Sequence, residues 1–231
     1  MKKVSPISEA LAATKQIIVP GIILWIIALG ILIGYYQIPA FMKLLGFIAD
    51  LKARYNYLYA MIATALFGGI IPYAYLRIRR STRHMAPLSH LPFATFYWAY
   101  KGAEINFLYT LLASLFGTNN HPSTIIAKVC IDQFVYNPFF NIPFTIVLYT
   151  WKEMDFDFKK TKSQLTWLFI KNRFISIAFS TWMVWIPTVA MVYALPALLQ
   201  VPFFNVILCF WVLLLSILTS QKKEIVGRVT H

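Results

Sequence analysis

The longest uncharged stretch of the chain runs from Phe174 to Ser220 and contains no Asp, Glu, Lys or Arg. As one helix it would be about 70 Å long at 1.5 Å per residue, whereas the hydrocarbon core of a bilayer is about 30 Å thick. The stretch is therefore expected to lie in a membrane and to reverse direction once. We predict the turn between Pro196 and Pro202, with Gln200 between them, because proline removes a helix hydrogen bond.

The composition of the whole chain also indicates a membrane protein. Hydrophobic residues make up 59% of the 231 residues, charged residues make up 13%, and the mean hydropathy is +0.65, so a single soluble domain is excluded. Five interruptions leave six apolar segments, at Ile17–Tyr36, Tyr57–Leu76, Leu91–Phe116, Thr124–Trp151, Phe174–Leu199 and Pro202–Thr219. The predicted fold is an all-α integral membrane protein, a polytopic helical bundle of about six spans.

The predicted organisation has three parts. Residues 1–56 form an N-terminal segment with an extra first span, residues 57–220 form a multi-span helical bundle, and residues 221–231 form a basic C-terminal tail. The run Ile17–Tyr36 is longer than the apolar region of a signal peptide, so we expect an uncleaved span.

Lys and Arg are distributed unevenly between the apolar segments. If the N-terminus is inside, sixteen of them lie in inside segments and only Lys43, Lys52 and Arg54 lie outside. Because cytoplasmic loops carry an excess of Lys and Arg, this bias predicts six spans with both termini inside. If the run from Phe174 to Ser220 crossed only once, the basic C-terminal tail would lie outside and this bias would be weaker.

The net charge of +13 fits a membrane surface better than nucleic acid. The basic residues flank apolar runs, where they would contact anionic lipid head groups, and a nucleic-acid partner is not expected. A lysine-rich start that contains Glu9 and no arginine disfavours a mitochondrial transit peptide. We therefore expect a bacterial cytoplasmic membrane, with a mitochondrial inner or peroxisomal membrane as the alternative. The oligomeric state stays open, and a homo-oligomer is possible.

The fourth connecting segment is basic and partly amphipathic. Its apolar and basic residues alternate near helical spacing, so either an amphipathic helix in the membrane interface or an ordinary basic connector is expected. The apolar residues are Phe158, Leu165, Leu168 and Phe169, and the basic ones are Lys159, Lys160 and Lys171.

Two pairs of charged residues lie within predicted spans. Lys101 and Glu104 are three residues apart, and Lys128 and Asp132 are four apart, so each pair can neutralise itself along one helix face. Such charges cost roughly 2.5–3.5 kcal/mol each on insertion scales and usually face the bundle interior or water. The short loop 117–123 predicts an antiparallel hairpin that places Glu104 near Tyr136. The charges then form either a polar solute path or an internal lock.

The second of these spans also contains a predicted helix break. Pro138 and Pro143 each lack an N–H, which should free the carbonyls of Phe134 and Phe139. Freed carbonyls within a bilayer need partners, so this backbone should face protein or a water-filled cavity. The polar residues around the break are Asp132, Gln133, Asn137 and Asn141.

An ordered series of residues resembles a known family. It contains Gly102, Tyr109, Lys128-Val129-Cys130-Ile131-Asp132-Gln133, Pro138, Trp182, Trp185, Leu195-Pro196, Trp211 and Ser216. The series is similar to the peroxisomal membrane protein twenty-two / Mpv-seventeen family, which includes the yeast mitochondrial Sym-one protein. The resemblance covers about residues 60–219. The chain departs from the family pattern at Gln200 and Val212, where the family has Arg and Asn.

The resemblance implies a pore for small solutes or a role in metabolite and membrane homeostasis. We expect no enzymatic activity and no cofactor, since there is no metal-ligand spacing, phosphate loop or nucleophile elbow in the sequence. The leading hypothesis is a channel-like protein that passes small hydrophilic solutes. A structural or scaffold protein, in which the same charges form a lock, is the alternative, and a coupled secondary transporter is the third.

Overall fold

The computed structural model describes residues 6–80, 82–83 and 86–229, and side-chain burial is described only between residues 18 and 214. Every regular element in the described ranges is helical. The elements are α1 (Pro6–Gln37), α2 (Pro39–Thr64), η1 (Ala65–Ile70), α3 (Ile71–Ile78), η3 (Leu88–His90), α4 (Leu91–Phe116), α5 (Pro122–Ile131), η4 (Asp132–Asn141), α6 (Ile142–Glu153), α7 (Phe158–Gln164), α8 (Trp167–Tyr193) and α9 (Ala197–Val229).

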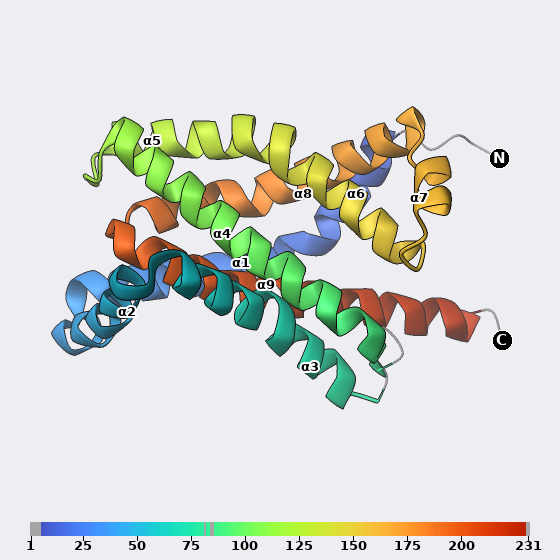
Figure 1. The fold of residues 1–231 in the computed structure, drawn as a ribbon, viewed down its shortest axis with the longest axis horizontal. Helices are drawn as coiled ribbons and strands as arrows, with labels where there is room; N and C mark the ends of the chain where they lie inside the picture. Colours follow the sequence, from blue (N-terminus) through green and yellow to red (C-terminus); the bar gives the residue numbers. More distant parts are fainter. Residues whose placement is uncertain (1–5, 81, 84–85, 230–231) are drawn as a thin grey trace.

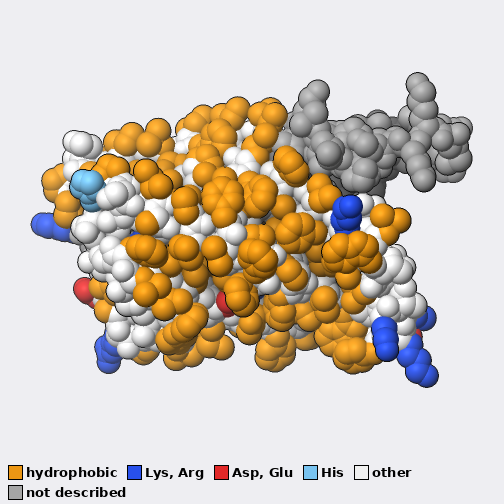
Figure 2. Space-filling model, turned by 90° about the horizontal axis from the view of Figure 1, so that it is seen from above, with side chains coloured by type: hydrophobic (Ala, Val, Ile, Leu, Met, Phe, Trp, Pro, Cys, Tyr) orange, Lys and Arg blue, Asp and Glu red, His pale blue; other side chains and the backbone are white. Residues whose placement is uncertain are grey.

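Four helical stretches are long and apolar enough to cross a membrane: Ile18–Gln37, Pro39–Ile78, Trp167–Tyr193 and Ala197–Leu214. Figure 2 shows hydrophobic side chains over most of the visible side of the molecule, with Lys and Arg mainly toward its ends. Large apolar residues such as Phe96 and Phe139 are more than 70% exposed. A soluble protein would not expose so much apolar surface, so this is a membrane protein.

The stretch Pro39–Ile78 contains 40 residues, about twice what one crossing needs. It bends at Asn56, whose φ of 39° and ψ of −105° are not helical. The part before Asn56 lies at one end of the molecule in Figure 1, and the part after it runs the length of the bundle with η1 and α3. The span predicted to begin at Tyr57 therefore starts directly after this bend.

The uncharged run reverses once, as predicted, but at a different place. Helix α8 ends at Tyr193 and α9 begins at Ala197, so the turn overlaps the predicted interval only at Pro196, and Pro202 is inside α9. The Gln200 side chain donates to the carbonyl of Leu195 over 3.0 Å. This bond accounts for the position of the turn, because it gives a buried carbonyl in the connection a partner.

Helix α1 packs in parallel along α8 and is part of the same core. The indole of Trp25 donates to the carbonyl of Val184 over 3.0 Å, and the Tyr36 hydroxyl donates to the carbonyl of Ala194 over 2.8 Å. Leu24 in α1 is fully buried. The first helix thus covers one side of α8.

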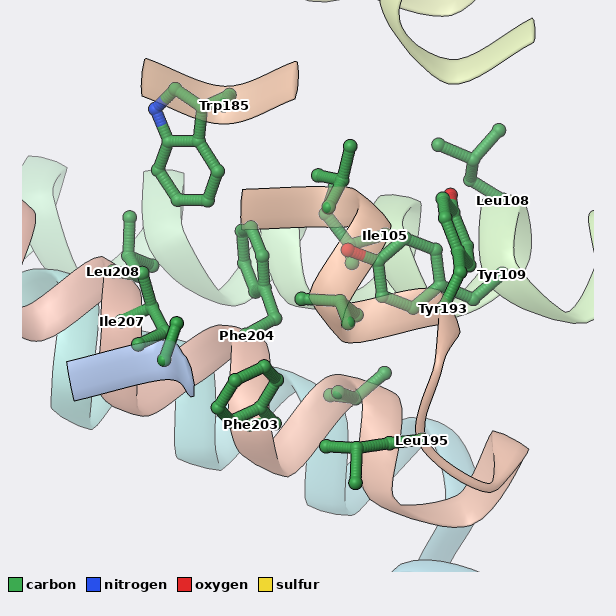
Figure 3. Close-up of a cluster of buried hydrophobic side chains, with 14 of the residues drawn as sticks. Ile105, Leu108, Tyr109, Trp185, Tyr193, Leu195, Phe203, Phe204, Ile207 and Leu208 are labelled. Atoms are coloured by element: carbon green, nitrogen blue, oxygen red, sulfur yellow. The ribbon is translucent and has the colours of Figure 1, made fainter. Parts of the chain in front are cut away.

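The main hydrophobic core lies between α4, α8 and α9. Figure 3 shows Tyr109, Trp185, Tyr193 and Phe204 pointing toward one another from these helices. Their rings make edge and tilted contacts, with centroids 5.2 Å apart for Tyr109 and Tyr193 and 5.5 Å apart for Trp185 and Phe204. Such aromatic pairs stabilise a core beyond the area that they bury.

The basic connecting segment does not form one amphipathic helix. Helix α7 ends at Gln164, and α8 begins at Trp167 with Thr166 as its N-cap. Phe158 and Leu168 are exposed, whereas Phe169 packs against the second apolar cluster, around Ile142. Thr166 Oγ1 accepts a hydrogen bond from the Phe169 main-chain N–H and caps a new helix, which explains why the predicted 158–171 periodicity is interrupted.

Candidate functional site

A buried polar seam lies between α4 and η4, deep in the bundle. Its position depends on Gly102, which lets α4 approach α2 closely. A Cβ atom added to Gly102 would lie 2.3 Å from the carbonyl oxygen of Ala60. Only glycine fits there, and the neighbouring Lys101 is buried, with 5% of its surface exposed.

Lys101 is the centre of the first half of the seam. Its ammonium lies 2.5 Å from Glu104 Oε2, 3.0 Å from the Tyr136 hydroxyl and 2.8 Å from Asn141 Oδ1. Asn141 in turn donates to Asn137 Oδ1 over 2.7 Å. The predicted Lys101–Glu104 pair and the predicted hairpin, which brings Tyr136 to this depth, are both confirmed. Three acceptors compensate the buried ammonium.

The predicted helix break at Pro138 is instead a widened helix. Residues 132–141 form the π-helix η4, in which main-chain N–H groups bond to carbonyls five residues earlier, as Ile142 does to Asn137. Pro143 is the second residue of α6, which follows η4 without a break. The helix therefore continues, and a five-residue pattern replaces the predicted breaks.

This π-helical pattern changes which carbonyl is left free. In it, Pro138 would pair with Gln133, five residues earlier, but proline has no N–H to donate. The indole of Trp182 in α8 donates to the Gln133 carbonyl over 2.7 Å. The predicted free carbonyl at Phe134 is therefore wrong by one residue, because the prediction assumed an α-helix. A tryptophan side chain replaces the missing main-chain donor.

Asp132 forms the second half of the seam. Its carboxylate is 4% exposed and accepts hydrogen bonds from the Tyr193 hydroxyl over 2.6 Å and from Gln133 Nε2 over 2.9 Å. The Tyr193 hydroxyl thus connects α8 to η4.

The predicted pairing of Lys128 with Asp132 is not observed. Lys128 is 2% exposed, and its ammonium lies 5.8 Å from the centre of the Tyr193 ring, in a cation–π contact. Among the described residues no salt bridge joins Lys128 to a carboxylate. The reason is that Tyr193 contacts both groups. Its ring packs against the Lys128 ammonium, and its hydroxyl donates to Asp132.

Three polar atoms around the seam are buried without a hydrogen-bond partner. They are Tyr109 Oη, Gln133 Oε1 and Asn137 Nδ2. Buried polar groups in proteins are nearly always paired with protein or water. Unused donors and acceptors beside a charged network can therefore bind water or a small hydrophilic solute.

Several residues of the polar interior were not predicted as site residues. Tyr193 lies within a predicted span and is buried, and Asn106 is a buried asparagine in the middle of α4. Lys52 lies in a predicted outside segment, yet it is 5% exposed and bonds to Asn56 over 3.1 Å. The polarity of Asn106 within an apolar run was the one sequence signal that could have revealed it.

The remaining family-motif residues lie on three helices or directly before one of them. Gly102 and Tyr109 are on α4, Trp182 and Trp185 are on α8, Pro196 precedes α9, and Trp211 is on α9, where its ring centroid is 6.3 Å from that of Trp185. Ser216 is in α9 at a position whose side chain lies outside the described residues.

Fold and site together define an all-helical membrane protein with a buried, charged seam in its bundle. Comparisons of the chain with protein-family models, with curated proteins and with solved structures give no match.

Proposed function

We propose that this is a channel-like membrane protein that passes small hydrophilic solutes along the seam between α4 and η4. The observation that carries the proposal is the set of buried polar atoms without partners beside the Lys101–Glu104 and Asp132–Tyr193 contacts. Lys, Asp and Asn side chains at this depth are costly in a membrane and typically mark a solute or ion pathway. Asp132 and Glu104 would set the charge preference of the path.

The proposed topology has six spans with both termini inside. In addition to the four apolar stretches, α4 and the continuous helix α5–η4–α6 would cross the membrane, with their charges facing inward. Helix α7, the end of α3 and the beginning of α8 lie at the same end of the molecule in Figure 1. These segments contain or adjoin most of the basic connecting residues, so this end would face the cytoplasm and anionic lipid head groups.

We also propose membership of the Mpv-seventeen-like family, in a bacterial cytoplasmic membrane and without enzymatic activity. Contacts between separate motif elements support this proposal. The indole of Trp182 binds the Gln133 carbonyl, and the ring centroids of Trp185 and Trp211 are 6.3 Å apart. Motif elements that are far apart in the sequence thus contact one another in the folded bundle.

One observation favours the alternative function, a scaffold protein with an internal charge lock. The Lys101 ammonium has three partners, including a 2.5 Å contact with Glu104, so this part of the seam needs no solute to be satisfied. A lock of this kind would hold α4 against η4 and would carry no flux.

The deciding experiment compares wild-type protein with the Asp132→Asn variant in planar bilayers and liposomes. Single-channel conductance, ion selectivity and uptake of small uncharged solutes would be measured. A channel predicts flux in the wild type and altered selectivity in the variant, because one carboxylate is removed from the path. Asp50→Asn, at an exposed position of α2, is the matched control and should behave as the wild type. A folded wild-type protein without flux would reject the channel in favour of the scaffold.

A further inference from the structure

A cavity that contains a buried lysine lies at the end of the molecule opposite α7. It has a volume of about 300 Å³ and is lined by α2 around its bend, by the second half of α4 and by the first turn of α9. In Figure 1 the first part of α2 and the beginning of α9 lie together at this end. The volume is at the lower limit for sites that bind small molecules.

Lys52 makes this cavity electrically positive. It is 5% exposed, and its ammonium donates a hydrogen bond over 3.1 Å to Asn56 Oδ1, which is a neutral acceptor. Within the described part of the chain, Lys52 forms no salt bridge, and the cavity lining contains no Asp or Glu. Burial of an ammonium without a counter-charge is unfavourable, so an anion in the cavity would supply what the protein lacks.

The bend at Asn56 holds the cavity open in a defined shape. Asn106 in α4 also donates to Asn56 Oδ1, over 3.1 Å, so one amide oxygen joins Lys52 and Asn106. Asn56 has a φ of 39° and a ψ of −105°, so the chain leaves the helical conformation at this residue. Lys52 has two further N–H donors and Asn106 has one more, and each can bind an oxyanion oxygen.

The first turn of α9 adds to the positive potential. Ala197 and Leu198, the first two residues of this helix, line the cavity. The first main-chain N–H groups of a helix have no partner within the helix, and the helix dipole is positive at this end. A helix N-terminus next to a buried, uncompensated lysine is favourable for carboxylate or phosphate groups.

We propose that this cavity binds a small oxyanion, a carboxylate or a phosphate group, between Lys52, Asn106 and the first turn of α9. The site goes beyond the proposed channel function and does not depend on it, because it is defined by binding rather than by flux. Tyr109 lines the cavity and also packs on Tyr193, which binds Asp132, so the cavity adjoins the seam.

The test is equilibrium binding of radiolabelled succinate and inorganic phosphate to purified protein in nanodiscs of phosphatidylcholine. Saturable binding is expected for the wild type. Lys52→Met should weaken it at least about tenfold, since a hydrogen bond to a charged group is lost. Asn106→Asp, which adds a carboxylate next to Lys52 with almost the same shape, should weaken it similarly. Lys43→Met, at an exposed position of the same helix, should leave it unchanged.

Nanodiscs that contain phosphatidylglycerol distinguish the source of the oxyanion. If both probes still bind there, the site takes free anions; if the lipid competes with them, the site takes a lipid phosphate. The proposal is overturned if neither probe binds saturably to the folded wild type, or if Lys52→Met and Asn106→Asp bind as well as the wild type. Flux measurements are separate, so a failed channel and a failed binding site give different results.

Discussion

The indole N–H of Trp182 donates to the main-chain carbonyl of Gln133 over 2.7 Å, from a different helix and 49 positions along the chain. This is the carbonyl that Pro138 cannot satisfy in the π-helix η4. A side chain of α8 thus stabilises an irregular backbone that would otherwise leave a buried acceptor unpaired.

Loss of this hydrogen bond should destabilise the bundle only while Pro138 is present. Trp182→Phe is expected to lower the free energy of unfolding by about 1–3 kcal/mol from the unpaired carbonyl, in addition to lost packing. Pro138→Ala restores a main-chain N–H, so the same substitution should cost less in that background. A double-mutant cycle measured by denaturant unfolding in micelles gives the difference. Equal costs in both backgrounds would show that the bond does not compensate the proline.

Removal of one partner of the Lys101–Glu104 ion pair should destabilise the protein more than removal of both. Lys101→Met leaves the carboxylate of Glu104, which is 15% exposed, without its cation, and should cost about 3–5 kcal/mol. The double variant Lys101→Met with Glu104→Leu should regain most of that stability. Thermal unfolding of the wild type and of these two variants in micelles measures this. A double variant as unstable as Lys101→Met would argue against a charge lock.

A methyl group at Gly102 should force α4 away from α2. The added Cβ would lie 2.3 Å from the Ala60 carbonyl oxygen, a backbone atom that cannot rotate away, so Gly102→Ala should destabilise by about 1–3 kcal/mol. Gly30 in α1 is the matched control, since no atom lies within 4 Å of an added Cβ. Gly30→Ala should be neutral or stabilising by roughly 0.5–1 kcal/mol. Similar effects in both variants would contradict the close contact.

The topology predicts which side of the membrane each end faces. In a background with Cys130→Ala and Cys209→Ala, single cysteines at Lys43 and Ser163 occupy exposed positions in α2 and α7. A membrane-impermeant maleimide applied to intact cells should label the cysteine at position 43 and should label the one at 163 only after permeabilisation. Labelling of both from the same side would exclude the proposed arrangement.

The stability of the first turn of α7 should depend on pH. Asp157 caps this helix by accepting hydrogen bonds from the main-chain N–H groups of Lys160 and Lys159, and these bonds hold the pKa of Asp157 below its ordinary value. A lowered pKa means that the cap stabilises α7 above about pH 4 and is lost as the pH falls further. Amide exchange in α7 should therefore speed up on acidification. Asp157→Asn keeps a neutral cap and should remove this pH dependence.

The sequence by itself determined that the chain is helical and lies in a membrane. The uncharged run from Phe174 is too long for one crossing, so hydrophobicity and length alone required its reversal. The pairing of Lys101 with Glu104 also followed from helical spacing, because residues three apart share a helix face. Contacts that depend only on local helix geometry could therefore be predicted from the sequence.

Tertiary structure decided the contacts that join separate helices. Tyr193, and not the predicted Lys128, contacts Asp132. Trp182 donates to the Gln133 carbonyl, which is left free only in a π-helix. The buried position of Lys52 depends on the bend at Asn56 and on the approach of α4 and α9. None of these follows from spacing along one helix, since each depends on which faces meet in the folded bundle and on the exact width of a helical turn.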